Sequence, residues 1–340
     1  MLPLGWLTKY ESRHKALLAD KVARGLREAR ACLNAQSSQA AQDYVNVLLQ
    51  AGVDVLLIGR PADLKKVVAD AEQHLPRGSF WLKNTLAYNQ EFAQINKVLR
   101  KWIDYESFVG MKGRGKKEPW GGWMLAKVLM QRIKYCPYCN AETVYAFDFI
   151  RDEKLRLAKS AFDHFYPRAR YPFLGLSLYN LIPSCTRCNT SFKHDDYGST
   201  LLMAHPYVDD VHRGMEFRLL FKNHHAFVFC RDQDIDTVLF QERVAGQCPG
   251  GVEWARTFHH ETVYTELFRS EAADAYCSAI RYPKSYVANC TDDLRRAGLP
   301  EADIERLLYR CPIDDAQVDR YRHGKMIVDI VKAARIASEV

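Results

Sequence analysis

The chain lacks any apolar run near the roughly 20 residues that a helix needs to cross a bilayer. Its opening stretch, Met1 to Leu7, is apolar but shorter than the apolar core of a secretory signal, and charged residues follow it. Internal repeats and low-complexity tracts are also missing, which argues against a solenoid. We therefore expect a globular protein of the cytoplasm that has no membrane partner.

A strong charge of either sign is missing as well. Over 340 residues, 48 Lys and Arg face 41 Asp and Glu, which gives a net charge of +7. So small an excess permits a polyanionic partner but does not require one. Apolar residues make up 48% of the chain and charged residues 26%, which is usual for a globular protein with a packed core.

Most of the ten cysteines stand alone, and a cytoplasmic protein rarely uses a disulfide framework. Four of them form two pairs, Cys136/Cys139 and Cys185/Cys188, at the spacing at which two thiolates can bind one zinc ion. A redox dithiol would explain one such pair, but not two in a chain without a thioredoxin-like pattern. We therefore predict a structural Zn²⁺ held by these four cysteines.

Helical patterns dominate the first third of the chain. Apolar residues recur at steps of three and four between residues 18 and 29, as in an amphipathic helix. A second helix is expected to start after Ser37 or Ser38 and to stop at Gly52, after which residues 53–58 fit either a strand or a helix end. Pro61 fits the first turn of another helix. The basic, glycine-rich segment 112–117 then predicts a loop at the end of a helical N-terminal domain, residues 1–122.

The rest of the chain mixes strand and helix patterns. Residues 143–149 and 155–162 predict two strands, and a helix is expected from about Cys185. Residues 215–221 and 226–230 predict a hairpin, and helical periodicity returns from about Trp254. We therefore predict an α+β fold. A central module, residues 123–210, would be followed by a β-hairpin and helical region, residues 211–340.

Polar residues suited to catalysis lie between and just after the cysteine pairs. The intervening segment, residues 140–184, is longer than the about 15 to 20 residues of a plain zinc ribbon. Asp163 and Asn189 offer hard oxygen ligands that suit Mg²⁺ or Mn²⁺. His164, whose unperturbed pKa is near 6.5, is a natural base at neutral pH. Asn180 is expected in the loop between His164 and Asn189.

This combination resembles the HNH endonucleases, the ββα-metal nucleases, in their zinc-supported form. The resemblance covers residues 136–207, with Asn189 where many members carry a histidine. It implies a ββα-metal module in which His164 activates water and Asp163 and Asn189 bind the divalent ion. It also implies that Asn180 steadies the loop and the histidine. In the family pattern a glycine often follows the lysine that matches Lys193, whereas here His194 and Asp195 follow it.

The resemblance implies a metal-dependent endonuclease that hydrolyses nucleic-acid phosphodiester bonds. We expect Arg168, Arg187 and Lys193 to bind substrate phosphates as a group. The layout of helical flanks around the module is similar to nuclease subunits of bacterial anti-phage systems of the Septu and retron-associated type. That likeness implies an effector nuclease in antiviral defence with a partner ATPase. The alternative is a zinc-supported module that binds nucleic acid or protein without turnover.

Overall fold

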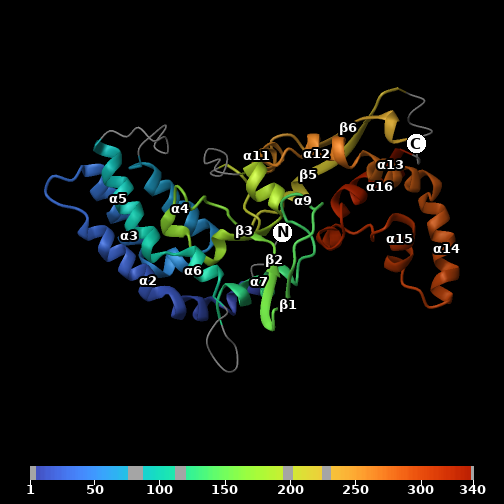
Figure 1. Ribbon diagram of the computed structural model, residues 1–340. Helices are drawn as coiled ribbons and strands as arrows, with labels where there is room; N and C mark the ends of the chain where they lie inside the picture. The colour runs from blue at the N-terminus through green and yellow to red at the C-terminus, as the bar shows by residue number, and fades with distance from the viewer. Residues whose placement is uncertain (1–4, 76–86, 112–119, 194–201, 224–230, 338–340) are drawn as a thin grey trace.

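The computed structural model describes residues 5–75, 87–111, 120–193, 202–223 and 231–337. Figure 1 shows the N-terminal helices on the left, a central part with small sheets, and C-terminal helices beside a β-hairpin on the right. Helices and antiparallel two-stranded sheets together make this an α+β chain, as predicted. Within the ranges described, none of the helices has both the length and the apolar character that crossing a membrane demands.

The N-terminal region is helical, as the periodicity predicted. Its helices are α1 (Gly5–Thr8), α2 (Glu11–Ala31), α3 (Gln39–Ile58), α4 (Pro61–Glu72), α5 (Ala87–Trp102), α6 (Tyr105–Val109) and α7 (Gly122–Met130). Leu18, Val22 and Leu26 form the buried face of α2. Helix α5 packs close to α2 at Gly25, where an added Cβ would lie 3.2 Å from that of Trp102.

Helix α3 shows both the predicted start and the predicted break. The Ser38 hydroxyl caps its first turn by accepting the N–H of Ala41. Gly52 interrupts the helix with a φ of 74°, which glycine adopts at little cost. The helix resumes over residues 53–58, so the structure decides against a strand there. Pro61 then begins α4, as predicted.

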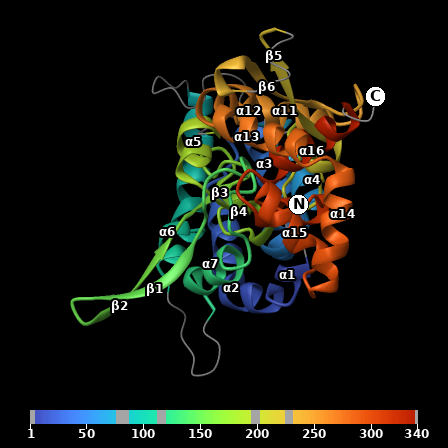
Figure 2. The same ribbon diagram turned by 90° about the vertical axis from the view of Figure 1, so that its right-hand side faces the viewer.

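The central part begins with a projecting β-hairpin. Strand β1 (Ala146–Arg151) pairs antiparallel with β2 (Lys154–Lys159). Asp152 and Glu153 join them with φ angles of 50° and 58°, the positive values that a tight type I′ turn requires. Figure 2 shows this hairpin extending away from the body of the molecule. The single strand predicted over residues 155–162 is therefore two, because the chain turns after β2 and starts a new sheet.

The second sheet carries two of the predicted site residues, Asp163 and His164. Strand β3 (Ala161–His164) pairs antiparallel with β4 (Leu181–Ser184) and places Asp163 opposite Ile182. Two short 3₁₀ helices, η1 (Pro172–Leu174) and η2 (Leu178–Asn180), lie between these two strands. After β4 the chain enters η3 (Arg187–Lys193), which is a π-helix. The order of elements is therefore strand, loop, strand, helix.

The C-terminal region combines a hairpin with helices. Its elements are α9 (Val211–Gly214), β5 (Met215–Phe221), η4 (Asp232–Asp234), β6 (Ile235–Glu242), α11 (Pro249–Thr257), α12 (His260–Leu267), α13 (Arg269–Arg281), α14 (Lys284–Arg296), α15 (Glu301–Tyr309), η5 (Asp315–Arg320) and α16 (Gly324–Ala337). Strand β5 pairs with β6, which the sequence did not predict. The strand predicted at 226–230 and the basic loop predicted at 112–117 lie outside the described residues.

The buried core is continuous along the chain. One cluster of buried apolar residues extends from Leu7 in α1 to Ala334 in α16. Leu125 in α7 and Val211 in α9 belong to it, close to the predicted boundaries at residues 122 and 210. The division into three domains stays a prediction.

Candidate functional site

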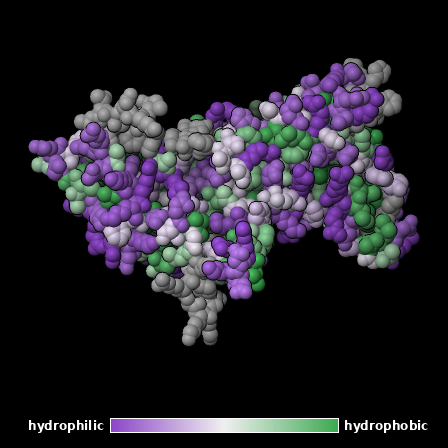
Figure 3. All heavy atoms as spheres, viewed as in Figure 1, coloured by the Kyte–Doolittle hydropathy of each residue, from purple (hydrophilic) through white to green (hydrophobic). Residues whose placement is uncertain are grey.

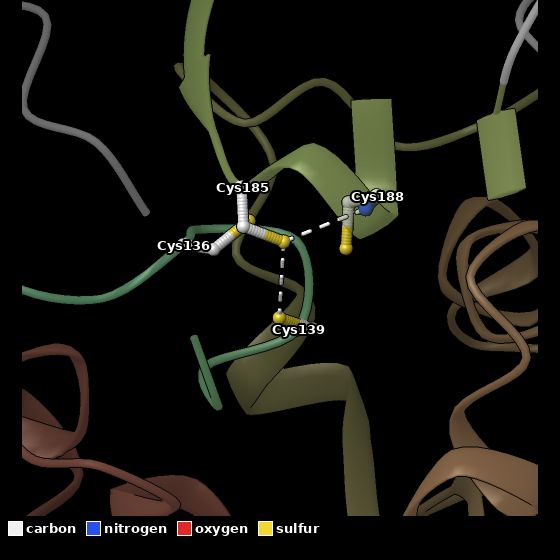
Figure 4. Close-up of side chains that lie close together, drawn as sticks. All are labelled: Cys136, Cys139, Cys185 and Cys188. Carbon is white, nitrogen blue, oxygen red and sulfur yellow. Dashed lines mark hydrogen bonds between the residues drawn. The ribbon is translucent and has the colours of Figure 1, made fainter. Parts of the chain in front are cut away.

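Four cysteine side chains meet where the central segment begins and ends (Figure 4). The sulfur atoms of Cys136, Cys139, Cys185 and Cys188 all lie within 4.8 Å of one another, and all four residues are buried. The Sγ atoms of Cys139 and Cys185 are 4.0 Å apart, near the about 3.8 Å expected for two sulfurs on one tetrahedral zinc ion. The cluster therefore fits a metal such as zinc, as the sequence predicted.

The electrostatics of the cluster favour a cation. Burial raises the pKa of the Cys136 and Cys188 thiols well above their usual value. Hydrogen bonds from neighbouring thiols lower the pKa of Cys139 and Cys185. Four thiols this close cannot all ionise unless a cation compensates their charge. Metal binding would therefore release protons and weaken at low pH.

The C-terminal region fixes the backbone of the first cysteine pair. Asn140, with a φ of 51°, accepts the N–H of His323 on its main-chain carbonyl at 2.9 Å. Its side-chain oxygen accepts the N–H of Lys325 at 3.2 Å. The indole of Trp254 donates to the carbonyl of Tyr138 at 3.0 Å. The turn that carries Cys136 and Cys139 is thus held by residues of the C-terminal region.

The carboxylate of Asp163 is buried and accepts hydrogen bonds from two donors. The Tyr138 hydroxyl donates to Oδ2 at 2.5 Å, and Lys193 Nζ lies 3.0 Å from Oδ1 and 2.9 Å from Oδ2. Asp163 is 4% exposed and Lys193 only 1%. A buried charge needs such a partner because water no longer solvates it. Tyr138 lies between Cys136 and Cys139 in sequence, so it links the cysteine cluster to this carboxylate.

The ring of His164 is held in one orientation and one tautomer. Its Nε2 atom lies 3.0 Å from the carbonyl oxygen of Gly175. A carbonyl only accepts, so the neutral ring carries its proton on Nε2 and keeps a lone pair on Nδ1. Burial lowers the pKa of His164 to about 4, which leaves the ring neutral at pH 7. The ring of Tyr105 packs edge-on against it with centroids 4.5 Å apart.

Asn180 fastens the loop between β3 and β4. Its side-chain oxygen accepts the N–H of Tyr166 at 2.7 Å. Its amide donates to the carbonyls of Tyr166 at 3.0 Å and Leu174 at 3.1 Å. Leu174 precedes Gly175, whose carbonyl holds the His164 ring. This fully buried amide therefore fixes the backbone next to Gly175, whose carbonyl contacts the His164 ring. The role that the resemblance implies for Asn180 stays a prediction.

Four of the predicted site residues line one cleft. Asp163, His164 and Asn189 border a space of about 440 Å³ together with Tyr105 and Arg168. Asn189 is half-buried on η3, and its N–H donates to the carbonyl of Cys185 at 3.0 Å. The fold therefore brings together a carboxylate and an imidazole from β3 and an amide from η3.

The three predicted phosphate-binding cations lie in different surroundings. Arg168 lines the cleft and pairs with Glu106 at 2.7 Å. Arg187 instead pairs with Glu142 at 3.5 Å. Lys193 is sealed inside and bonded to Asp163. Among the described residues, Arg168 is therefore the member of this group that borders the cleft.

A histidine from the N-terminal helices also holds the site loop. The Nε2 atom of His14 in α2 lies 2.7 Å from the carbonyl oxygen of Leu176, the residue after Gly175. The indole of Trp120 donates to His14 Nδ1 at 3.2 Å. Burial lowers the pKa of His14 to about 4, so its ring is neutral and donates from Nε2. The loop that orients His164 is thus anchored from outside the central part.

The cleft offers a partial fit to a hard divalent ion. A carboxylate can accept hydrogen bonds in about four lone-pair directions, two on each oxygen. In Asp163, Tyr138 and Lys193 occupy the two directions on Oδ2, and Lys193 occupies one of the two on Oδ1. Counting donors from the described residues alone, one direction at Oδ1 stays open, and Asn189 borders the same cleft. Oxygen donors of this kind suit Mg²⁺ or Mn²⁺. An ion there would share Asp163 with the ammonium of Lys193.

Sequence reasoning missed three contributors to the site. Tyr138 stands inside the first cysteine pair, so its position was a usable signal. Tyr105 lies far from the motif in sequence, and no local pattern links it to His164. Gly175 acts through its carbonyl, which no side-chain motif can show.

Comparison of the chain with protein-family models, with curated proteins and with solved structures finds no match. Inference about function therefore depends on the site itself.

Proposed function

We propose that this protein is a metal-dependent endonuclease of the HNH, or ββα-metal, type that hydrolyses nucleic-acid phosphodiester bonds. The observation that carries the proposal is the shared cleft of Asp163, His164 and Asn189. Further support comes from the order β3, β4, η3, which follows the strand, strand, helix order of that module. The adjoining cysteine cluster, predicted to hold structural Zn²⁺, would keep the two ends of the module together.

In this proposal His164 is the general base. Its Nε2–H group donates a hydrogen bond to the carbonyl of Gly175, so Nδ1 is the ring nitrogen that would accept the proton of the attacking water. A pKa near 4 makes the ring a weak acceptor in the free protein, and the negative charge of a bound phosphate would raise that pKa. Arg168 would hold that phosphate at the mouth of the cleft.

The proposed catalytic ion is Mg²⁺ or Mn²⁺, held by Asp163 and Asn189. When bound, it would supply the positive charge that stabilises the departing 3′ oxygen. Lys193 would hold the Asp163 carboxylate in place. Asn180 would maintain the loop geometry on which the position of His164 depends.

A second function is supported by the ion pair at Asp163. Because Lys193 and Tyr138 already satisfy that carboxylate, the module could be a stable binding domain that needs no catalytic ion. It would then bind nucleic acid or protein on its zinc-supported frame without turnover. Cleavage by the purified protein separates the two functions.

The test is incubation of the purified chain with DNA and with RNA, with Mg²⁺, with Mn²⁺ and with EDTA. The nuclease proposal expects cutting only with metal, leaving 5′-phosphate and 3′-hydroxyl ends. Binding without any cutting, in either metal and with either nucleic acid, favours the second function.

The biological setting is a proposal from the resemblance alone. An effector nuclease of a bacterial anti-phage system, working in the cytoplasm with a partner ATPase, would co-purify with that partner from its host. A solitary monomer in host extract, by size exclusion and affinity capture, counts against this setting and leaves the nuclease chemistry open.

A further inference from the structure

The hairpin of β1 and β2 forms an arm, residues 146–159, whose two faces differ in chemistry. Directly opposed residues of an antiparallel pair share a face, and neighbours along a strand alternate between faces. The register pairs Phe147 with Ala158, Phe149 with Arg156, and Arg151 with Lys154. We define these residues together with Tyr145 as the aromatic face. Tyr145 continues the pairing, because its carbonyl accepts the N–H of Ser160 at 2.9 Å.

The aromatic face combines rings and cations and carries no acidic side chain. Its members are Tyr145, Phe147, Phe149, Arg151, Lys154, Arg156 and Ala158. Tyr145 is 46% exposed, Phe147 53% and Phe149 38%. The space-filling view shows hydrophobic and hydrophilic atoms side by side over this hairpin (Figure 3). Aromatic rings this exposed are costly in water unless a partner covers them.

The opposite face of the arm contacts the body of the molecule at its base and is apolar near its tip. There Asp148 pairs with Lys127 of α7 at 2.5 Å, which ties the base of the arm to the body. Ile150 and Leu155 lie opposite each other near the tip, 76% and 52% exposed. The turn residues Asp152 and Glu153 lie beyond the last strand pair. Of the cations of the aromatic face, Arg151 lies 3.8 Å from the carboxylate of Asp152 in the turn. Both side chains are highly exposed, so this ion pair is weak and a phosphate can replace it.

We propose that the aromatic face of the arm binds single-stranded nucleic acid, by stacking of bases on Tyr145, Phe147 and Phe149 and by pairing of phosphates with Arg151, Lys154 and Arg156. Charge complementarity selects a polyanion, and the rings select one with exposed flat bases. A duplex hides the faces of its bases, which makes it the poorer occupant. The face has no Asn or Gln to read base edges, so binding would tolerate many sequences.

This inference rests on the proposed nuclease function, because it assigns the arm to the substrate of the same module. Strand β2 leads directly into β3, which carries Asp163 and His164. A strand held on the arm would therefore be tethered next to the cleft. Binding and cutting can be measured separately, so the two proposals can fail separately.

The test measures binding of a labelled 20-nucleotide single strand to the His164→Ala protein by fluorescence anisotropy, with the matching duplex as comparison. Phe147→Ala with Phe149→Ala is expected to weaken binding about tenfold or more. The matched control is Ile150→Ala with Leu155→Ala on the opposite face, which should bind like its parent. Lys154→Gln with Arg156→Gln should flatten the plot of log affinity against log salt by about 1.4.

Equal binding by the two double variants would overturn the assignment of the aromatic face. Tighter binding of the duplex, or capture of a protein by this face with no affinity for nucleic acid, would overturn the choice of occupant. If the face binds single strands and the wild-type protein never cuts them, the arm proposal stands and the nuclease proposal fails. If wild type and the Phe variant cut and bind alike, the arm proposal fails and the nuclease proposal stands.

Discussion

The ammonium of Lys193 lies within 3.0 Å of both carboxylate oxygens of Asp163, and both side chains are buried. The sequence suggested that Asp163 binds metal and that Lys193 grips phosphate. In the fold each is the other's main partner. The pair therefore decides how strongly the cleft can attract a divalent ion.

We expect Lys193→Met to destabilise the protein by about 3 to 5 kcal/mol, because it leaves a buried carboxylate without its cation. Urea unfolding measures the loss. Added Mg²⁺ or Mn²⁺ should restore part of it, since the ion would take over the freed lone pairs of Asp163. The matched control is Lys193→Met with Asp163→Asn, in which metal should restore nothing. Equal stabilisation of both variants by metal would place the ion elsewhere.

The cysteine cluster should bind one zinc ion per chain. Cys139→Ser removes one thiolate, so metal content by atomic emission should fall and thermal unfolding should move to lower temperature. Cys32→Ser alters a cysteine far from the cluster in sequence and should keep both the metal and the stability of the wild type. A wild-type protein purified without any bound metal, yet equally stable in a strong chelator, would contradict a structural ion.

The two asparagines of the site should separate stability from activity. Asn180→Ala leaves the buried N–H of Tyr166 unpaired, which should cost about 1 to 3 kcal/mol. Asn189→Ala removes a half-buried side chain at the cleft and should lower metal-dependent cutting with little loss of stability. Chemical unfolding and a cleavage assay on both variants check this. A larger stability loss from Asn189→Ala would invert the roles assigned here.

Acid should weaken the anchor between the N-terminal helices and the site loop. The pKa of His14 is about 4 in the folded protein, against about 6.5 when unfolded, so the unfolded chain binds the proton more readily. Its contribution is complete above pH 6.5 and is lost as pH falls toward 4, by about 3 kcal/mol in all. His14→Gln cannot titrate, so its unfolding free energy should fall less over this interval. Parallel pH curves for the two proteins would contradict the assignment.

The sequence predicted those features of the fold that depend on a single residue or on a short spacing. Ser38 caps a helix, Gly52 breaks it and Pro61 begins the next, because each residue restricts its own backbone. The paired cysteines predicted their own cluster for the same reason, since a shared ion demands that spacing. Asp163, His164 and Asn189 were expected to meet, and they border one cleft.

Contacts between distant segments could not be predicted. Tyr105 reaches His164 from α6, and His14 reaches the carbonyl of Leu176 from α2. Such pairs depend on how whole helices pack, which no window of sequence contains. Strand β6 was missed for a related reason. The sequence pattern does not say how many residues separate β5 from its partner strand, and β6 begins later than the strand predicted at 226–230.

The most direct measurement is the single-turnover rate of nucleic-acid cutting by wild type and by His164→Ala, at saturating Mg²⁺ or Mn²⁺. If His164 Nδ1 takes the proton of the attacking water, the variant should cut about 10²- to 10⁴-fold more slowly while binding the substrate equally well. Cutting at the wild-type rate by a folded His164→Ala protein would contradict the account.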